Sequence, residues 1–370
     1  MTKNNEHKNL NVPDLRFPEF SGEWVETELQ DIVPNICSGK DRISNSGEVA
    51  LYGSTGVIGR TNSASYKENI VLVARVGANA GQMQIGNAPC GVTDNTLVID
   101  AKEWNYYIYY FLQHYNLNRL VFGSGQPLIT GGMLKRIKVR YGCKAERNNI
   151  TRLLCLIDER IATQNKIIEK LESLIKGIYS SILWKDYRLV SLSEIFIERN
   201  ERTTTNNQYQ VLSSTAKGLY RQSDYFDKEV ASANNVGYKV LRLGDIVLSP
   251  QNLWLGNINY NDAFKIGIVS PSYKVFSIRE GYNPYYVSCF LKTPKALYEY
   301  ANASEQGASV VRRNLDVNAF MAICFPMPNR IMQDRISERV RAINMKLDIE
   351  KQVFEKLNIE KQYLLRQLFI

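Results

Sequence analysis

Two segments of the chain repeat the same heptad pattern, and this repeat is the feature that most constrains the fold. The first segment spans residues 146–185 and the second spans residues 331–370. In the first segment, the apolar residues that recur at heptad spacing are Ile150, Leu154, Ile157, Ile161, Ile168, Leu171, Ile175, Ile178 and Ile182. Such spacing predicts a long α-helix that buries one stripe of side chains against a partner helix.

The second segment matches the first at an offset of 186 residues. The matched positions are Ile336, Val340, Ile343, Leu347, Phe354, Leu357, Lys361, Leu364 and Leu368, of which only Lys361 is not apolar. We call the stripe of heptad positions on each helix its seam. A polar residue inside the seam recurs as well, as Gln164 in the first segment and Glu350 in the second. One such helix could arise by chance, but two in the same register predict a tandem duplication.

We expect the two helices to pack on each other as an antiparallel coiled coil, although each could instead pack only on its own domain. A helix of about 33 residues is roughly 50 Å long, so an antiparallel pair would hold the preceding regions at opposite ends. A polar residue at one seam position costs stability but can fix register. Gln164 and Glu350 are the candidates for that role.

The regions between the helices consist of short strands and turns, and these follow one another in the same order in both halves. The glycine-punctuated stretch from Gly53-Ser54-Thr55 to Arg60 resembles the stretch from Ser213-Ser214-Thr215 to Arg221. Each half then has an aromatic helical stretch (106–120 and 284–300), a polar loop (122–132 and 304–316), and a closing strand or short helix. The module and its helix therefore recur together.

The length of the chain favours two domains. We predict an N-terminal tail and first module over 1–145, a long helix over 146–185, a second module over 186–330 and a long helix over 331–370. The fold class is α+β: two mixed α/β modules are joined by two long antiparallel helices, with a pseudo-two-fold internal repeat.

The charge balance allows a polyanionic partner without requiring one. There are 46 Lys and Arg residues against 37 Asp and Glu residues, which gives a net charge of +9 and a pI near 9.1. Basic proteins often bind nucleic acid, but many do not.

Cysteine and histidine usage argues against a metal centre and against a histidine-based triad. The six cysteines are scattered without CxxC spacing, and only two histidines occur. We expect buried free thiols in a reducing cytoplasm, with no zinc site. The polar N-terminus does not resemble a signal peptide, and no apolar stretch is long enough to span a membrane.

Two motifs could suggest an enzyme. Asn283-Pro284-Tyr285-Tyr286 resembles the NPPY motif of amino-methyltransferases, but it lacks the second proline, and no glycine-rich turn follows a strand to seat S-adenosylmethionine. We interpret it as a helix start with Pro284 at the first helical position. The glycine loops at 53–59 and 123–132 lack the phosphate-binding fingerprints and are turns by default.

Several loops combine residues that can read base edges, because Arg pairs with guanine and Asn or Gln with adenine through two hydrogen bonds. The candidates in the first module are Lys40, Arg42, Ser54, Thr55, Arg60, Arg75, Asn79, Gln82 and Gln126. Those in the second module are Lys217, Arg221, Gln251, Asn252, Arg312 and Arg313. A solvated surface position is the alternative for each single residue.

Together these features resemble a type I restriction-modification specificity (S) subunit. The resemblance lies in the opening PDLRFPEF with GEW, in YGSTGVIGR and GVTDNTLVI, and in the helix that begins ERNNITRLLCLIDERIATQNK. It implies two target recognition domains that each read half of a split sequence in double-stranded DNA, on antiparallel helices that act as a ruler.

The same resemblance implies two methyltransferase (M) subunits docked on the helices, and restriction (R) subunits that complete the nuclease. S-adenosylmethionine, ATP and Mg²⁺ would bind those partners, and this chain would have no catalytic residue of its own. Two other interpretations stay open: an amino-methyltransferase, and a coiled-coil interaction protein without sequence-specific DNA binding.

Overall fold

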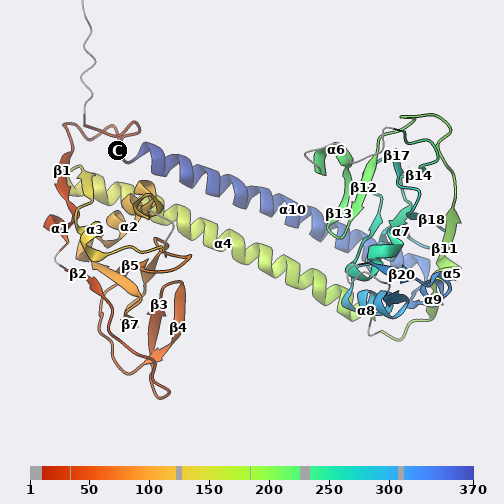
Figure 1. Ribbon diagram of the computed structural model, residues 1–370, viewed down its shortest axis with the longest axis horizontal. Coiled ribbons are helices and arrows are strands. Elements are labelled where there is room, and N and C mark those ends of the chain that lie inside the picture. Colours follow the sequence, from red (N-terminus) through yellow and green to blue (C-terminus); the bar gives the residue numbers. More distant parts are fainter. Residues whose placement is uncertain (1–10, 34, 122–126, 184, 226–233, 307–311) are drawn as a thin grey trace, which may run out of the picture. The chain divides into compact units, whose positions relative to one another are not determined.

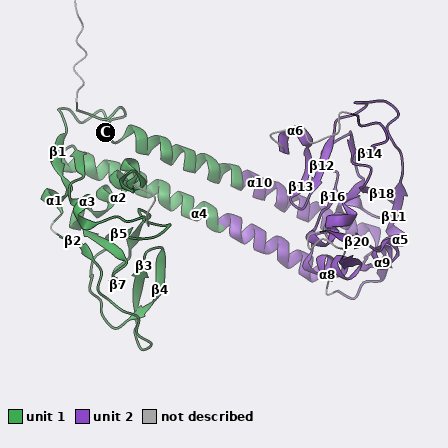
Figure 2. Ribbon diagram, in the orientation of Figure 1, with its two compact units in different colours: residues 1–166, 351–370 green, residues 167–350 purple. Residues whose placement is uncertain are grey.

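The computed structural model describes residues 11–33, 35–121, 127–183, 185–225, 234–306 and 312–370, and it divides into two compact units (Figure 2). Unit 1 comprises residues 1–166 and 351–370, and unit 2 comprises residues 167–350. Each unit therefore contains one β-rich module and a part of each long helix. Among the described residues, no helix is both long and apolar enough to cross a membrane.

An antiparallel four-stranded sheet forms the centre of unit 1 (Figure 1). In spatial order its strands are β2 (Asn35–Ser38), β8 (Thr96–Asp100), β5 (Ile70–Ala74) and β6 (Met83–Gly86). Successive side chains of a strand point to opposite faces, and both faces of β5 are covered. Val71 and Val73 pack with helix α2 (Asn105–Tyr115), whereas Leu72 packs under a smaller sheet.

The smaller sheet and the short elements complete the first module. The smaller sheet has the order β4 (Gly56–Thr61), β3 (Val49–Gly53) and β7 (Cys90–Val92). Strand β1 (Val25–Glu28) pairs antiparallel with β9 (Lys138–Tyr141), which directly precedes the first long helix. The short helices are α1 (Leu29–Ile32), η1 (Lys102–Trp104), η2 (Leu117–Leu120) and α3 (Gly131–Lys135).

Unit 2 is built around a second antiparallel sheet of four strands. In spatial order these are β11 (Phe196–Arg199), β18 (Lys274–Ile278), β15 (Ile246–Leu248) and β16 (Ile258–Tyr260). On one face, Ile246 and Phe276 pack with helices α7 (Pro284–Ser288) and α8 (Pro294–Asn302). On the other face, Val247 and Val275 pack under further strands.

The remaining elements of the second module are short. The paired strands are β10 (Leu189–Ser191) with β21 (Cys324–Pro326), β12 (Leu212–Thr215) with β13 (Gly218–Arg221), β14 (Lys239–Arg242) with β17 (Ile266–Val269), and β19 (Ser304–Gln306) with β20 (Arg313–Leu315). The helices are α5 (Leu192–Ile195), α6 (Gln222–Tyr225), η3 (Pro250–Leu255) and α9 (Val317–Ala322).

The predicted internal repeat is confirmed by the sheet topology. The order β2-β8-β5-β6 in the first module corresponds strand by strand to β11-β18-β15-β16 in the second. The pair β1–β9 corresponds to β10–β21, and the hairpin β3–β4 corresponds to β12–β13. Both modules also have the predicted closing segment, a short helix followed by a strand, as α3–β9 and α9–β21.

The two long helices are α4 (Lys144–Leu183) and α10 (Arg330–Gln367). In unit 1, the beginning of α4, with Ile150 and Leu154, shares a core with Leu364 and Leu368 at the end of α10. In unit 2, Ile182 at the end of α4 shares a core with the beginning of α10. The helices therefore run in opposite directions within each unit, as predicted. The same cores also contain module residues, so each helix packs on its module as well.

The seam residues face inward along both helices. All eighteen matched positions are buried or half-buried, as are Gln164 and Glu350, which are each 8% exposed. Neighbouring apolar side chains such as Leu156 and Leu174 are exposed by 53% and 51%. Lys361, the basic seam residue, forms an ion pair with Asp158 at 2.6 Å.

Three expectations are corrected by the structure. The aromatic stretch 284–300 is two helices, α7 and α8, because Thr293 caps a new helix with Pro294 at its first turn. The expected loop 304–316 contributes the paired strands β19 and β20. All six cysteines are free, but Cys143 and Cys324 are exposed, so the expectation of a buried thiol is wrong for both. Cys324 alternates with the buried Phe325 and points outward.

Candidate nucleic-acid interface

The β3–β4 and β12–β13 hairpins have the same construction in the two modules. Each has a two-residue turn, Ser54-Thr55 in the first and Ala216-Lys217 in the second. The turn is followed by a glycine with positive φ, +147° at Gly56 and +155° at Gly218. Residues other than glycine rarely adopt this backbone conformation. The shared backbone geometry makes the two hairpins structural equivalents.

The strand register corrects the equivalence expected from the sequence. Arg60 lies opposite Ala50, and Arg221 lies opposite Leu212. Each of these partners lies three residues before the end of the first strand of its hairpin. The two arginines are therefore equivalent, but Gly53 matches Thr215 and not Ser213. A bulge in the first hairpin, between Leu51 and Tyr52 in the pairing, adds one residue to β4, so Arg60 is four residues after Gly56 whereas Arg221 is three residues after Gly218.

A second group in the first module lies on the segment that follows β2. Lys40 and Arg42 are both exposed and help to line a cavity of about 450 Å³ beside the β3–β4 hairpin. The intervening Asp41 points inward, where its carboxylate accepts hydrogen bonds from the Val92 amide at 2.8 Å and the Ser65 hydroxyl at 2.6 Å. Asp41 thus anchors the two basic residues.

The connection between β5 and β6 carries the third group. Arg75 and Ser54 both bond to the Asn95 carbonyl, the former through its amide at 3.1 Å and the latter through its hydroxyl at 3.1 Å. The hairpin turn and this connection are therefore adjacent. Asn79 and Gln82 lie at the surface of this connection and bond to each other at 3.1 Å. Gln126 lies outside the described residues.

In the second module, the remaining candidates gather around η3. Gln251 and Asn252 belong to this helix, and the Arg313 guanidinium stacks on Trp254 of the same helix at 4.3 Å. Arg312 is exposed beside it. Strand β20 thus packs beside η3 and places Arg313 on the helix that carries Gln251 and Asn252, whereas Lys217 and Arg221 lie on the hairpin.

Sequence reasoning missed the buried amides that support these loops. Asn257 and Asn259, which flank and belong to β16, are 6% and 5% exposed, and both bond to Ser214 of the β12–β13 hairpin. Lys292 donates to Asn259 at 2.7 Å, and burial lowers the pKa of its ammonium group. The alternating Asn-Ile-Asn around a strand was the available signal, because polar side chains on a buried face need partners.

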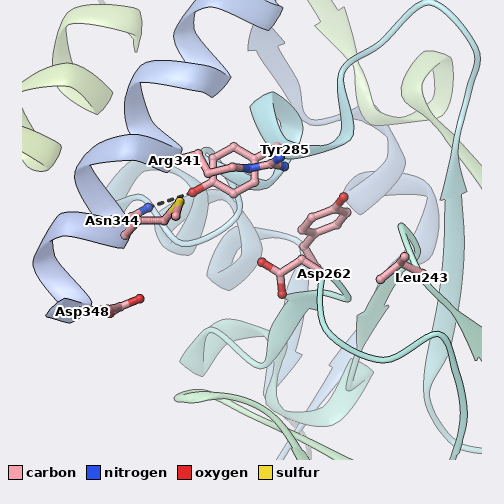
Figure 3. A pocket seen from close by; sticks show the side chains of 8 residues that line it. Leu243, Asp262, Tyr285, Arg341, Asn344 and Asp348 are labelled. Atoms are coloured by element: carbon pink, nitrogen blue, oxygen red, sulfur yellow. Dashed lines mark hydrogen bonds between the residues drawn. The ribbon is translucent and has the colours of Figure 1, made fainter. Parts of the chain in front are cut away.

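A cavity of about 400 Å³ in unit 2 was also not predicted (Figure 3). In it the Arg341 guanidinium lies over the Tyr285 ring at 4.6 Å, and Asn344 donates to the Tyr285 hydroxyl at 2.9 Å. Burial raises the pKa of Tyr285, and Asp262 and Asp348 contribute acidic groups to the rim.

The Asn283–Tyr286 motif has a structural role. The Asn283 side chain caps α7 by accepting from the Tyr286 amide at 3.0 Å, and it donates to Asp334 at 2.6 Å. Tyr286 is fully buried, and its hydroxyl donates to the Pro326 carbonyl at 3.2 Å. The predicted helix start is confirmed. Among the described residues, no group of three His, Cys, Asp or Glu side chains could hold a metal ion.

A comparison with protein families gives a match to the first part of the chain. Residues 21–173 match the model of the type I restriction modification DNA specificity domain. The matched range covers most of the first module and the greater part of α4. The topological repeat extends the same fold to the second module.

A solved structure has a similar fold over nearly the whole length of this chain. The S subunit of a type I restriction-modification system from M. genitalium is 16% identical, with 97% of this chain and 99% of that chain covered and a TM-score of 0.67. The HsdS subunit from Thermoanaerobacter tengcongensis is 12% identical, with 94% and 96% covered and a TM-score of 0.41. No curated protein sequence matches the chain.

Proposed function

We propose that this chain is the specificity subunit of a type I restriction-modification complex, in which each module reads one half of a split DNA sequence. One observation carries the proposal: a single fold occurs twice on an antiparallel helix pair, and its first copy matches the DNA specificity domain. A protein with two copies of one reading module is suited to a target with two half-sites.

The chemistry of the exposed loops supports this role. The net charge of +9 favours association with the phosphate backbone. The arginines Arg60 and Arg221 occupy equivalent exposed positions, and an arginine can contact guanine through two hydrogen bonds. The other described candidates lie on the same two modules, where polar and basic side chains can reach bases or phosphates.

In this proposal the chain itself catalyses no reaction. Methyltransferase subunits dock on it and supply S-adenosylmethionine chemistry, and restriction subunits supply ATP- and Mg²⁺-dependent cleavage. The DNA partner and the free thiols fit a reducing cytoplasm.

Methylation mapping tests the proposal. Cells that express the chain with its methyltransferase subunit should contain methylated adenines in a bipartite motif, and cells without the chain should lack it. A contiguous motif, or methylation that does not depend on the chain, would overturn the proposal. In binding experiments, a coiled-coil protein without sequence recognition would bind all duplexes alike, with only a salt-dependent affinity.

A further inference from the structure

The two equivalent hairpins are each tied to the central sheet at the same backbone atom. In the first module, the Gln84 side-chain amide donates to the carbonyl of Gly53 at 2.8 Å. In the second, the Asn259 side-chain amide donates to the carbonyl of Thr215 at 2.9 Å. Gly53 and Thr215 are the last residues before the two turns. One bond of the same kind therefore fixes both turns.

The two donors also occupy the same place in the sheet. Gln84 on β6 lies opposite Leu72, and Asn259 on β16 lies opposite Val247. Leu72 and Val247 both belong to the clusters on the face that lies away from the module helices. The side chains of the edge strands thus reach the hairpins from matching positions, although one is a glutamine and the other an asparagine.

The second module adds further bonds to the same turn. Lys292 donates to the carbonyl of Ala216 at 3.0 Å and to the Asn259 oxygen at 2.7 Å. The Thr215 hydroxyl accepts from the Lys217 amide at 3.1 Å and the Gly218 amide at 3.2 Å. The polar groups of Asn259 are buried, and burying them is favourable only because they are paired. The bonds therefore hold the backbone of the turn in one conformation.

Each hairpin exposes a polar or basic side chain at its turn and an arginine on the strand that follows. Thr55 and Lys217 are the exposed second residues of the two turns, and Arg60 and Arg221 are exposed on the strands that leave them. A two-stranded ribbon fits the major groove of B-DNA, which is about 12 Å wide. A turn that is already ordered loses less conformational entropy when it binds.

We propose that the β3–β4 and β12–β13 hairpins are the groove-contacting elements of their modules, and that Gln84 and Asn259 are positioning residues that fix the hairpin turns for base readout. This inference rests on the proposed function. It assigns DNA contact to Thr55, Arg60, Lys217 and Arg221, and an indirect role to the two amides.

The contact residues are tested one module at a time in the full chain with its methyltransferase subunit. Arg60→Ala should relax base preference in one half of the methylated motif, and Arg221→Ala should relax it in the other half. We expect a loss of discrimination of about 5- to 150-fold at the affected base pair, because a bidentate contact distinguishes bases by about 1–3 kcal/mol. Lys295→Ala, an exposed basic residue on α8, is the control and should leave both halves unchanged.

The positioning residues are tested with isosteric variants. Gln84→Glu and Asn259→Asp remove the donor that faces the turn carbonyl, while the carboxylate introduced in the second variant can still accept from Lys292. Each variant should relax only the half-motif read by its own module, with the other half retained at wild-type discrimination. A purely structural role would instead reduce the amount of methylation without changing the base preference. Thermal unfolding of each variant identifies any that fails to fold.

The outcomes separate this inference from the proposed function. If the wild-type chain directs no bipartite motif, the proposed function fails. If the wild type does so and the Arg60 and Arg221 variants, which are exposed and should fold, leave both half-motifs unchanged, the hairpins are not the groove-contacting elements. If these variants act but folded Gln84→Glu and Asn259→Asp do not, the positioning role is wrong.

Discussion

Arg16 and Glu146 form a well-buried ion pair that joins the N-terminal segment to a long helix. The guanidinium donates to both carboxylate oxygens, at 2.7 and 3.0 Å, and the Glu146 side chain is 1% exposed. Glu146 lies in the first turn of α4, where a negative charge also complements the helix dipole. The pair therefore fixes residues 11–24 against the beginning of the helix.

Arg16→Met should destabilise unit 1 by about 2–4 kcal/mol, because it leaves a buried carboxylate without its partner. Hydrogen exchange along the first turns of α4, measured on the intact chain, would show this as faster exchange. Arg140→Met is the matched control, since it removes a partner of the more exposed Glu26 and should cost less than about 1 kcal/mol. Equal effects of the two variants would contradict the argument.

His114 should make the stability of unit 1 depend on pH. Its ring lies 5.8 Å from that of Phe369, and burial lowers its pKa below the usual 6.5. The unfolded chain therefore binds a proton at a higher pH than the folded chain does. The stabilising contribution is complete above about pH 6.5 and is lost as the pH falls from there through the lowered folded pKa.

The melting temperature of the wild type should accordingly fall between about pH 7.5 and about pH 5.5. His114→Phe keeps a ring in the core and should reduce that fall. The chain has one other histidine, His7, so His7→Gln is the control and should behave like the wild type. A His114→Phe variant with an unchanged pH dependence would contradict the assignment.

At the scale of elements, a helix or strand could be predicted where its own sequence pattern is long and regular. The long helices, of 40 and 38 residues, could be predicted because the heptad pattern continues through most of each helix. The break between α7 and α8 was missed, although Thr293-Pro294 is a helix-start signal and a proline disfavours helix at the preceding residue. The predicted match of Gly53 with Ser213 was wrong by two residues, because strand pairing fixes where each hairpin turns and the pairing places Gly53 at Thr215.

Seam burial gives a prediction for the long helices. Ile157 is 9% exposed within the core of unit 1, whereas its neighbour Leu156 is 53% exposed. Ile157→Asp should destabilise unit 1 by several kcal/mol because it buries an unpaired charge. Leu156→Asp places the same charge in solvent and should change stability by about 0.5 kcal/mol or less. Denaturant unfolding of both variants makes the comparison, and similar midpoints would contradict the packing.

The side-chain amides that support the two hairpins could not be identified from the sequence. Exposed Arg, Lys and Asn side chains could be nominated by residue type, and the structure shows that Arg60 and Arg221 are equivalent only through strand register. Gln84 and Asn259 could not be paired from the sequence, because their equivalence depends on which strands are neighbours in the sheet. Residue type identifies candidates, whereas topology identifies what supports them.

At the scale of the whole molecule, we predict that the length of the long helices sets the spacing between the two half-motifs. The duplication allows a test, because a matching heptad can be deleted from each helix. The contact of Asp158 with Lys361 sets the register of the antiparallel pair in unit 1. One heptad of each helix begins at the polar seam residue: residues 164–170 of α4 and, at the offset of 186, residues 350–356 of α10. Deleting both heptads removes about two turns from each helix, keeps the heptad phase on either side and leaves both modules intact.

Seven residues correspond to about 10.5 Å of helix, and DNA rises about 3.4 Å per base pair. We therefore expect the double deletion to shorten the spacer between the two half-motifs by about 3 base pairs, with both half-motif sequences unchanged. Methylation mapping measures this directly, and Arg60→Ala provides the converse case of an altered half-motif with an unchanged spacer. A deletion variant that folds and methylates with the original spacer would contradict this prediction. The distance between the half-motifs would then not depend on the length of the helices.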